Sequence, residues 1–91
     1  MKKRLECKIY GRVQMVMFRD FTRRNAVKLA LVGTVQNLDD GSVYVVSEGE
    51  EKNLRKLLKL LKKGPIFAKV KEVKEYWVEP IGGLSGFNIV Y

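Results

Sequence analysis

The chain has no histidine and one cysteine among its 91 residues. A Ser-His-Asp triad needs a histidine, and a zinc site built from histidine and cysteine needs several such ligands, so both are excluded. Cys7 has no partner for an internal disulfide, and its place on the apolar face of a predicted strand favours a buried hydrophobic role. No apolar run is long enough to cross a membrane, so we expect no membrane partner.

Glutamine and proline are also scarce. Glutamine is limited to Gln14 and Gln36, and proline to two positions in predicted connections, whereas lysine and glutamate are abundant. This balance is typical of heat-adapted proteins and indicates a thermophile. The basic start of residues 1–4 leads into strand-like alternation and not into an apolar signal core, so we expect a cytoplasmic protein. The length predicts a single domain over residues 1–91.

Basic residues are absent from residues 31–51, although the formal net charge is +8. Such a charge can attract nucleic acid, but base stacking also needs aromatic side chains on an exposed strand face, and the pattern shows none. We therefore expect no nucleic-acid partner, and the positive field suits an anionic small molecule equally well. One run of lysines is interpreted as the solvated face of a helix: Lys52, Lys56, Lys59, Lys62 and Lys63.

Hydrophobic periodicity predicts the fold. Alternation predicts strands at residues 5–10, 32–38, 43–47, 68–78 and 87–91. A modest apolar stripe predicts a helix at residues 20–29, and a clear one predicts a second helix that ends at Gly64 and carries Leu54, Leu57, Leu58 and Leu61. A change of register between Val70 and Val73 predicts a β-bulge. The order βαββαβ with a last short strand predicts an α+β ferredoxin-like split βαβ sandwich, with two helices on one face of an antiparallel sheet.

The segment from Gly11 to Arg19 connects the first strand to the first helix. The first N–H groups of a helix have no intrahelical partner, and consecutive amides in a tight turn converge into a positive concavity. Arg19 lies where the loop becomes helix, so its planar guanidinium can bind the same anion through two hydrogen bonds. The loop therefore predicts a site for a phosphate-sized anion.

Asn37 is a polar amide near the end of the second predicted strand. A split βαβ unit connects its first two strands by a right-handed crossover, so the loop after the first strand and the second strand can meet at one site. Asparagine also commonly starts a turn at such a position. Both interpretations of Asn37 stay open at the level of the sequence.

At these residues the chain resembles the acylphosphatases. Residues 9–19 match the family's first signature, Gly-x-Val-Gln-Gly-Val-x-Phe-Arg, at every position but one. Residues 33–49 match the second signature, including Asn37, Gly41, Val43 and Gly49, although Thr34 replaces the usual aromatic residue. The resemblance covers essentially the whole chain.

The resemblance implies a hydrolase that splits the carboxyl–phosphate bond of acyl phosphates into carboxylate and phosphate, without a metal or other cofactor. It assigns Arg19 and the amides of residues 15–19 to the phosphoryl group and Asn37 to the attacking water. It places substrate contacts on one loop, at Gln14, Met15, Val16, Met17 and Phe18. Inorganic phosphate is expected to bind as product and inhibitor, and we expect a monomer. Use as the first domain of a hydrogenase-maturation protein is disfavoured by the single-domain length.

Met15 departs from the family pattern, which has glycine at this position. Glycine permits a positive φ and a close approach of the backbone to an anion, whereas another side chain at positive φ costs about 1–2 kcal/mol. Two hypotheses follow: an acylphosphatase with reduced activity, or an anion or nucleic-acid binding protein with an impaired catalytic loop. A loop at negative φ would instead pack Met15 against Phe18 or Phe21. Ala30 similarly replaces a helix-ending glycine, which predicts strain at the helix exit.

Overall fold

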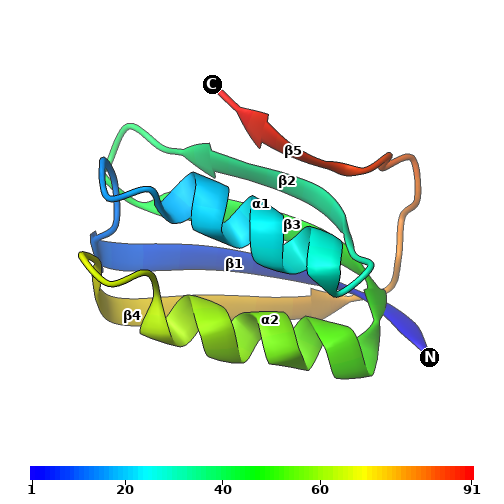
Figure 1. Ribbon diagram of the computed structural model, residues 1–91. Coiled ribbons are helices and arrows are strands. Elements are labelled where there is room, and N and C mark those ends of the chain that lie inside the picture. The colour runs from blue at the N-terminus through cyan, green and yellow to red at the C-terminus, as the bar shows by residue number, and fades with distance from the viewer.

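A computed structural model describes residues 1–91 and confirms the predicted order of elements (Figure 1). The elements are β1 (Lys2–Arg12), α1 (Phe18–Lys28), β2 (Val32–Asn37), β3 (Val43–Glu50), α2 (Glu51–Lys63), β4 (Lys69–Val78) and β5 (Phe87–Val90). The first strand is longer than predicted because its polar ends pair with β3 and β4 without adding to the core. Neither helix is long and apolar enough to cross a membrane.

The strands form one sheet in the order β4-β1-β3-β2-β5. The pairs among β4, β1, β3 and β2 are antiparallel, as predicted, but β5 pairs with β2 in parallel. The antiparallel prediction is therefore corrected to a mixed sheet. The cause is the path of residues 79–86, which stay at one end of the sheet while they lead from the β4 edge to the β5 edge (Figure 1).

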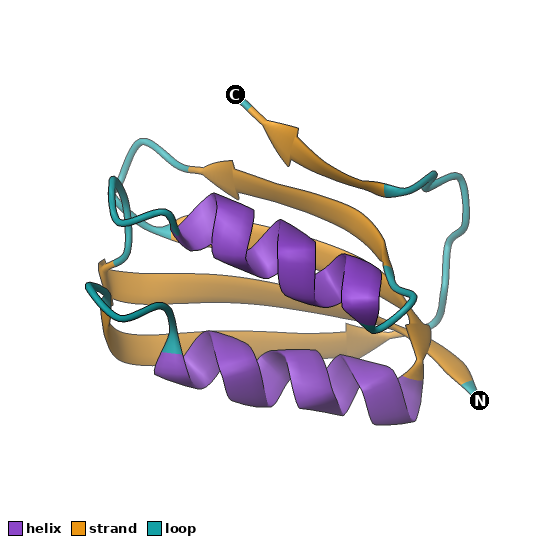
Figure 2. Cartoon of the chain, viewed as in Figure 1, coloured by secondary structure: helices purple, strands orange, loops and turns teal.

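Both helices cover the same face of the sheet, and the core lies between the two layers (Figure 2). Alternate residues of β1, namely Leu5, Cys7 and Ile9, point to the helices and are fully buried. The predicted apolar face of α2 is confirmed, because its leucines are buried in this core: Leu54, Leu57, Leu58 and Leu61. Burial of Cys7 raises the pKa of its thiol to about 12, which agrees with a hydrophobic role.

The predicted β-bulge is confirmed in β4. Tyr10 of β1 is opposite Glu72, and Gly11 is opposite Val70, so Lys71 is the extra residue. Gly11 has a φ of 130°, and a Cβ there would collide with the backbone of β4. The bulge and this glycine bring the end of β1 close to the start of β4, just before the β1–α1 loop begins.

No helix covers the other face of the sheet (Figure 2). The strand registers place Tyr10, Tyr44 and Tyr76 on this face, so the sequence-based expectation that no aromatic residues lie on an open strand face is wrong. The pattern could not show this, because the three strands that carry them are distant in sequence. Two of the rings have neighbours already: the Tyr44 hydroxyl bonds to Glu6, and the Lys8 ammonium lies 5.4 Å from the Tyr10 ring centroid.

The end of α1 confirms the predicted strain at Ala30. Ala30 has a φ of 57°, the left-handed conformation that usually requires glycine after a helix. Its N–H donates to Val27 O (3.0 Å), and the N–H of Leu31 donates to Ala26 O (3.0 Å). These two bonds satisfy the last carbonyls of the helix and hold the alanine in place. The side chain of Ala30 is exposed.

Candidate active site

The β1–α1 loop contains two methionines in the left-handed conformation. Met15 has a φ of 60° and Met17, which caps α1, has a φ of 63°. The Met15 side chain is 99% exposed. The alternative of a loop at negative φ, with Met15 packed against Phe18 or Phe21, is therefore wrong. The loop keeps the backbone that glycine would adopt, and the methionine side chain extends into solvent.

This conformation leaves a run of backbone donors unused. No backbone N–H from Met15 to Asp20 donates to a backbone carbonyl of the chain; the first amide of α1 that does so belongs to Phe21, which bonds to Met17 O (3.0 Å). The helix start accounts for part of the run, because its first N–H groups have no intrahelical acceptor. The left-handed conformation of Met15 and Met17 leaves the N–H groups of the loop itself without a backbone acceptor as well. The result is a concentration of partial positive charge suited to an anion.

Gln14 fixes this loop to the turn between β2 and β3. Its side-chain Nε2 donates to Leu38 O (2.8 Å) and to Ser42 O (2.9 Å). The turn is closed separately by the Asp40 carboxylate, which accepts bonds from the Ser42 hydroxyl and N–H and thereby has its pKa held well below its usual range. Two segments distant in sequence are thus held in fixed register.

A cleft of about 140 Å³ opens between the loop, β2 and the C-terminus. It brings Arg19 of α1 together with Asn37 of β2, the two residues assigned to catalysis from the sequence. The complete lining is Val13, Met15, Met17, Phe18, Arg19, Asp20, Asn37, Ile89 and Tyr91. Apolar side chains form most of this wall, so the few polar groups define where a charged ligand can bind.

The side chain of Asn37 does not support a turn. Its Oδ1 is buried and has no hydrogen-bond partner, whereas nearly all buried polar atoms of folded proteins have one. The β2–β3 turn is instead held by Asp40 and Gln14. Asn37 therefore lines the cleft and carries a buried acceptor that no group of the chain satisfies.

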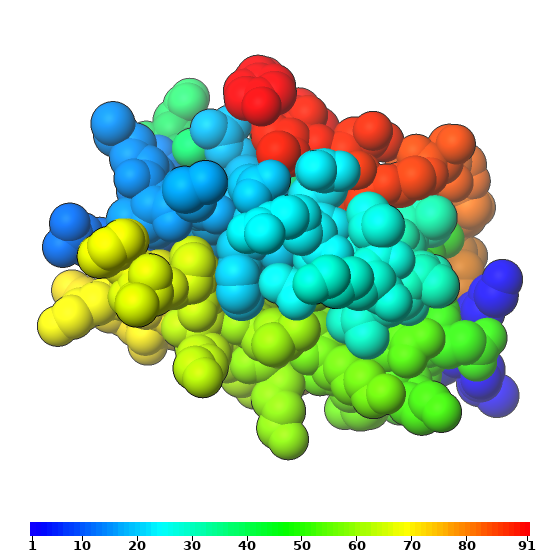
Figure 3. Space-filling view, viewed as in Figure 1, coloured from blue at the N-terminus to red at the C-terminus, as the bar shows by residue number.

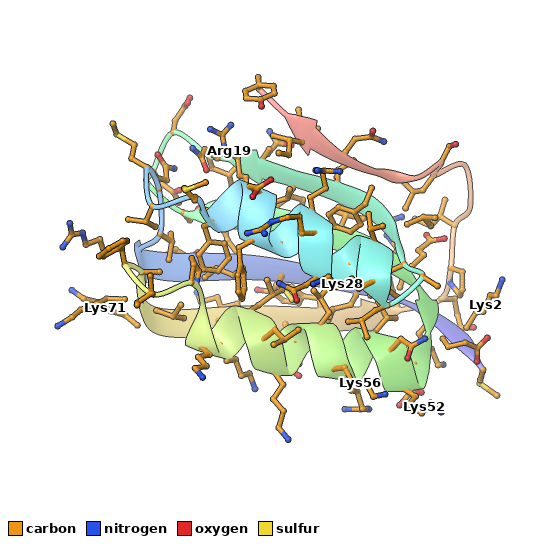
Figure 4. The ribbon with its side chains drawn as sticks, in the orientation of Figure 1. Lys2, Arg19, Lys28, Lys52, Lys56 and Lys71 are labelled. Carbon is orange, nitrogen blue, oxygen red and sulfur yellow. The ribbon has the colours of Figure 1, made fainter.

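Arg19 has no acidic partner. No carboxylate of the chain forms an ion pair with its guanidinium, and the neighbouring Asp20 pairs with Arg24 at 2.8 Å. The guanidinium carbon lies 4.9 Å from the ring centroid of Tyr91, in a cation–π contact. Figure 4 shows Arg19 at the start of α1, and it is among the residues that line the cleft. The aromatic ring thus contacts the guanidinium group, and the five N–H donors of Arg19 remain available to an anion.

The comparison with known proteins decides the family. A family model for acylphosphatases matches residues 5–89.

The chain belongs to the acylphosphatase family.

Its relatives match over almost the entire length of both chains. An acylphosphatase of Dehalococcoides mccartyi is 44% identical over 88 residues, which are 96% of this chain and 97% of the relative. One from Methanocella arvoryzae is 41% identical, with 96% and 98% covered. The crystal structure of an acylphosphatase from Bacillus subtilis superposes with a TM-score of 0.94 at 36% identity and covers both chains fully.

The family assignment confirms the predicted fold and the predicted reaction, hydrolysis of acyl phosphates by an enzyme acting on acid anhydrides. It does not favour the alternative of a binding protein with an impaired catalytic loop. The described residues contain no group of three or more His, Cys, Asp or Glu side chains arranged to hold a metal ion.

Placed in this acylphosphatase fold, the residues selected from the sequence divide into two groups. Met15, Met17, Phe18, Arg19 and Asn37 line the cleft. Two others do not: the Gln14 side chain is engaged with the β2–β3 turn, and Val16 packs against the core. They can act on a ligand only through their backbone and by holding the loop in shape.

The C-terminal segment also contributes to the cleft, which was not predicted from the sequence. Ile89 and Tyr91 form part of its wall because β5 pairs with β2, beside Asn37. Alternation predicted the strand, but nothing in the sequence indicated which edge of the sheet it would join.

Proposed function

We propose that this cleft hydrolyses acyl phosphates with Arg19 and the loop amides as the phosphoryl site and Asn37 as the residue that positions water. The observation that carries the proposal is the convergence of three unsatisfied groups. These are the amides from Met15 to Asp20, a guanidinium without an acidic partner, and a buried Oδ1 without a donor. An unsatisfied buried polar group calls for an explanation, and a bound ligand that completes it is one such explanation.

The chemistry needs few protein groups. Water attacks phosphorus, the bond between phosphorus and the acyl oxygen breaks, and the carboxylate leaves with the electron pair. The transition state is loose and carries negative charge on the phosphoryl oxygens. Stabilising this charge is the main requirement, and fixed hydrogen-bond donors do so. The attacking water forms little bond in such a transition state, and its proton passes to the product phosphate. A neutral amide at Asn37 can therefore orient the water without acting as a base.

Met15 is compatible with this role. The backbone at a φ of 60° already has the conformation that glycine would give, and the side chain extends into solvent. We therefore assign to Met15 a cost in stability of about 1–2 kcal/mol and no loss of the amide cradle. This choice favours a working enzyme over the hypothesis of an impaired loop.

The experiment that tests the proposal compares Arg19→Ala with Arg19→Lys. Hydrolysis of acetyl phosphate should be lost in the alanine variant, and inorganic phosphate should no longer compete. Lysine keeps the charge and loses the bidentate geometry, so it should restore weak phosphate binding with low turnover. All assays run with and without a chelator, and we expect equal rates. Phosphate that titrates Arg19→Ala like the parent protein would show that the anion binds elsewhere.

Four further assignments rest on the sequence. Residues 1–91 are proposed to act as one domain. They are also proposed to act as a monomer, because copies with a net charge of +8 repel one another. A cytoplasmic location and adaptation to heat are supported by abundant lysine and glutamate beside scarce glutamine. Sedimentation and a thermal melt test the monomer and the heat adaptation.

A further inference from the structure

The basic residues of this protein are concentrated on one corner of the fold. From Lys52 to Lys71 the chain has eight lysines and arginines and no acidic residue. We call residues 52–71 the basic corner; it comprises α2, the α2–β4 loop and the start of β4. Since the formal net charge is +8, the rest of the chain is neutral as a whole. The catalytic cleft lies toward the other edge of the sheet, beside β5, although the α2–β4 loop and the β1–α1 loop are at the same end of the molecule (Figure 1).

Most cations of the basic corner have no acidic partner within the chain. Arg55 pairs with Glu51 at 2.8 Å, and Lys62 pairs with Glu75 at 3.3 Å. The other side chains form no ion pair: Lys52, Lys56, Lys59, Lys63, Lys69 and Lys71. Those labelled in Figure 4 extend away from the fold. The corner therefore presents unneutralised positive charge to whatever approaches it.

Two large apolar side chains lie at the tip of this corner. Ile66 is 90% exposed and Phe67 is 73% exposed. They are the central residues of a turn closed by a bond from Ala68 N to Pro65 O (3.0 Å). Turn positions favour Gly, Asn, Asp or Ser for conformational reasons, so the turn itself does not require apolar residues here. Figure 3 shows the yellow residues of this loop projecting at the edge of the molecule.

The tip is held in this exposed position. Gly64 begins the loop at a φ of 74°, and a Cβ there would come within 3.1 Å of the Phe18 ring, so the base of the loop packs tightly on the core. The closing bond of the turn places Ile66 and Phe67 at its two central positions, where both side chains are exposed. An apolar tip with lysines around it suits a partner that offers both negative charge and an apolar layer.

We propose that the basic corner docks on the surface of an anionic lipid bilayer, which replaces the expectation from the sequence that the protein has no membrane partner; that expectation rested on the lack of a spanning segment. Ile66 and Phe67 enter the boundary between headgroups and acyl chains, and the surrounding lysines bind the acidic headgroups. Lysines next to such a surface are attracted to it, and apolar side chains strengthen the contact by leaving water. The contact is peripheral, and Ile66, Phe67 and the lysines that form it are not among the residues that line the cleft.

Two other partners of the basic corner would account for fewer of its features. A second copy of the chain would bring two clusters of unpaired lysines together, which repel each other. A nucleic acid would satisfy the lysines through its phosphates, and Phe67 could stack on a base. Ile66 has no ring to stack, however, although it is the more exposed of the pair. Only a bilayer uses the charge and both apolar residues.

The test measures sedimentation of the intact protein with vesicles. One set contains phosphatidylcholine with about 30% phosphatidylserine, and the other contains phosphatidylcholine alone, both at about 0.15 M salt, where distant charges are screened. We expect binding to the anionic vesicles only. The double variant Ile66→Ser/Phe67→Ser should bind about tenfold more weakly. Removing charge in Lys63→Gln/Lys71→Gln should weaken binding about fivefold per lysine.

Matched controls come from the other end of the molecule. Ile81 is 74% exposed in the β4–β5 connection, which Figure 1 shows opposite the α2–β4 loop, so Ile81→Ser should change binding less than about twofold. Lys2→Gln/Lys28→Gln removes as much charge away from the tip and should have an equally small effect. All variants alter exposed side chains, and equal melting temperatures will confirm that each is folded.

Three results would overturn the proposal. The first is no binding to anionic vesicles. The second is binding that Ile66→Ser/Phe67→Ser leaves unchanged, which would reduce the interaction to non-specific charge. The third is binding to a DNA duplex at the same salt that exceeds vesicle binding and depends on Lys63 and Lys71 but not on the apolar tip. That outcome would identify a nucleic-acid surface.

Discussion

Replacing Met15 by glycine separates the strain of the catalytic loop from its activity. Met15 has a φ of 60°, where a side chain costs about 1–2 kcal/mol. The side chain is 99% exposed, so its removal loses no packing. Glycine increases the conformational entropy of the unfolded chain, which lowers the free energy of unfolding by about 0.5–1 kcal/mol and offsets part of the gain from the relieved strain. The net stabilisation is about 0.5–1 kcal/mol, or a rise in Tm of about 3–6 °C for a chain of this length.

Ala30→Gly is the matched control. Ala30 has nearly the same φ, 57°, and an exposed side chain, but it lies at the other end of α1, away from the cleft. Both variants should gain similar stability in denaturant melts. Because the amides of the loop already have their conformation, the kcat/KM of both should stay within about threefold of the parent. A rise of tenfold or more in Met15→Gly alone would refute this reasoning, because each misdirected donor costs about a hundredfold in rate.

Two further predictions concern stability. Leu58→Ala should lower the free energy of unfolding by about 2–5 kcal/mol in denaturant melts, because Leu58 is buried against the sheet, and a loss below about 0.5 kcal/mol would contradict this placement. The Glu48 carboxylate accepts bonds from the N–H groups of Ile81 (2.9 Å) and Gly82 and from Arg4 (2.8 Å), and these donors lower its pKa. Its stabilisation is therefore present above the unfolded pKa of about 4.3 and is lost as the pH falls. Glu48→Gln should flatten the acid side of a stability–pH profile; an unchanged slope would place the dependence on other carboxylates.

The sequence predicted the elements and the core well because these depend on local periodicity. The leucine spacing of α2 and the register change in β4 each follow from a few neighbouring residues. The edge that β5 joins depends on the path of residues 79–86, which carry no periodic pattern. The contribution of Ile89 and Tyr91 to the wall of the cleft was not predicted for this reason. The aromatic residues on the open sheet face were missed because they come from three separate strands.

The candidate site was predicted from two signatures, and the structure refines what each residue does. Arg19 and Asn37 come together as expected. The glycine of the signature predicted a positive φ at Met15, and this is confirmed. The left-handed conformation of Met17 had no signal, since Ser, Thr, Asp or Asn is the usual residue before a helix. Gln14 was assigned to substrate, but its bonds to the β2–β3 turn give its side chain a structural task.

The most direct test of the account compares turnover with phosphate affinity in Asn37→Ala. The Oδ1 of Asn37 is buried without a donor, and we assign it to the attacking water and not to the bound phosphate. Loss of this side chain should lower kcat for acetyl phosphate by about a hundredfold or more, whereas the inhibition constant of inorganic phosphate should change less than about threefold. Equal losses of turnover and phosphate affinity would contradict the assignment and show that Asn37 only shapes the pocket.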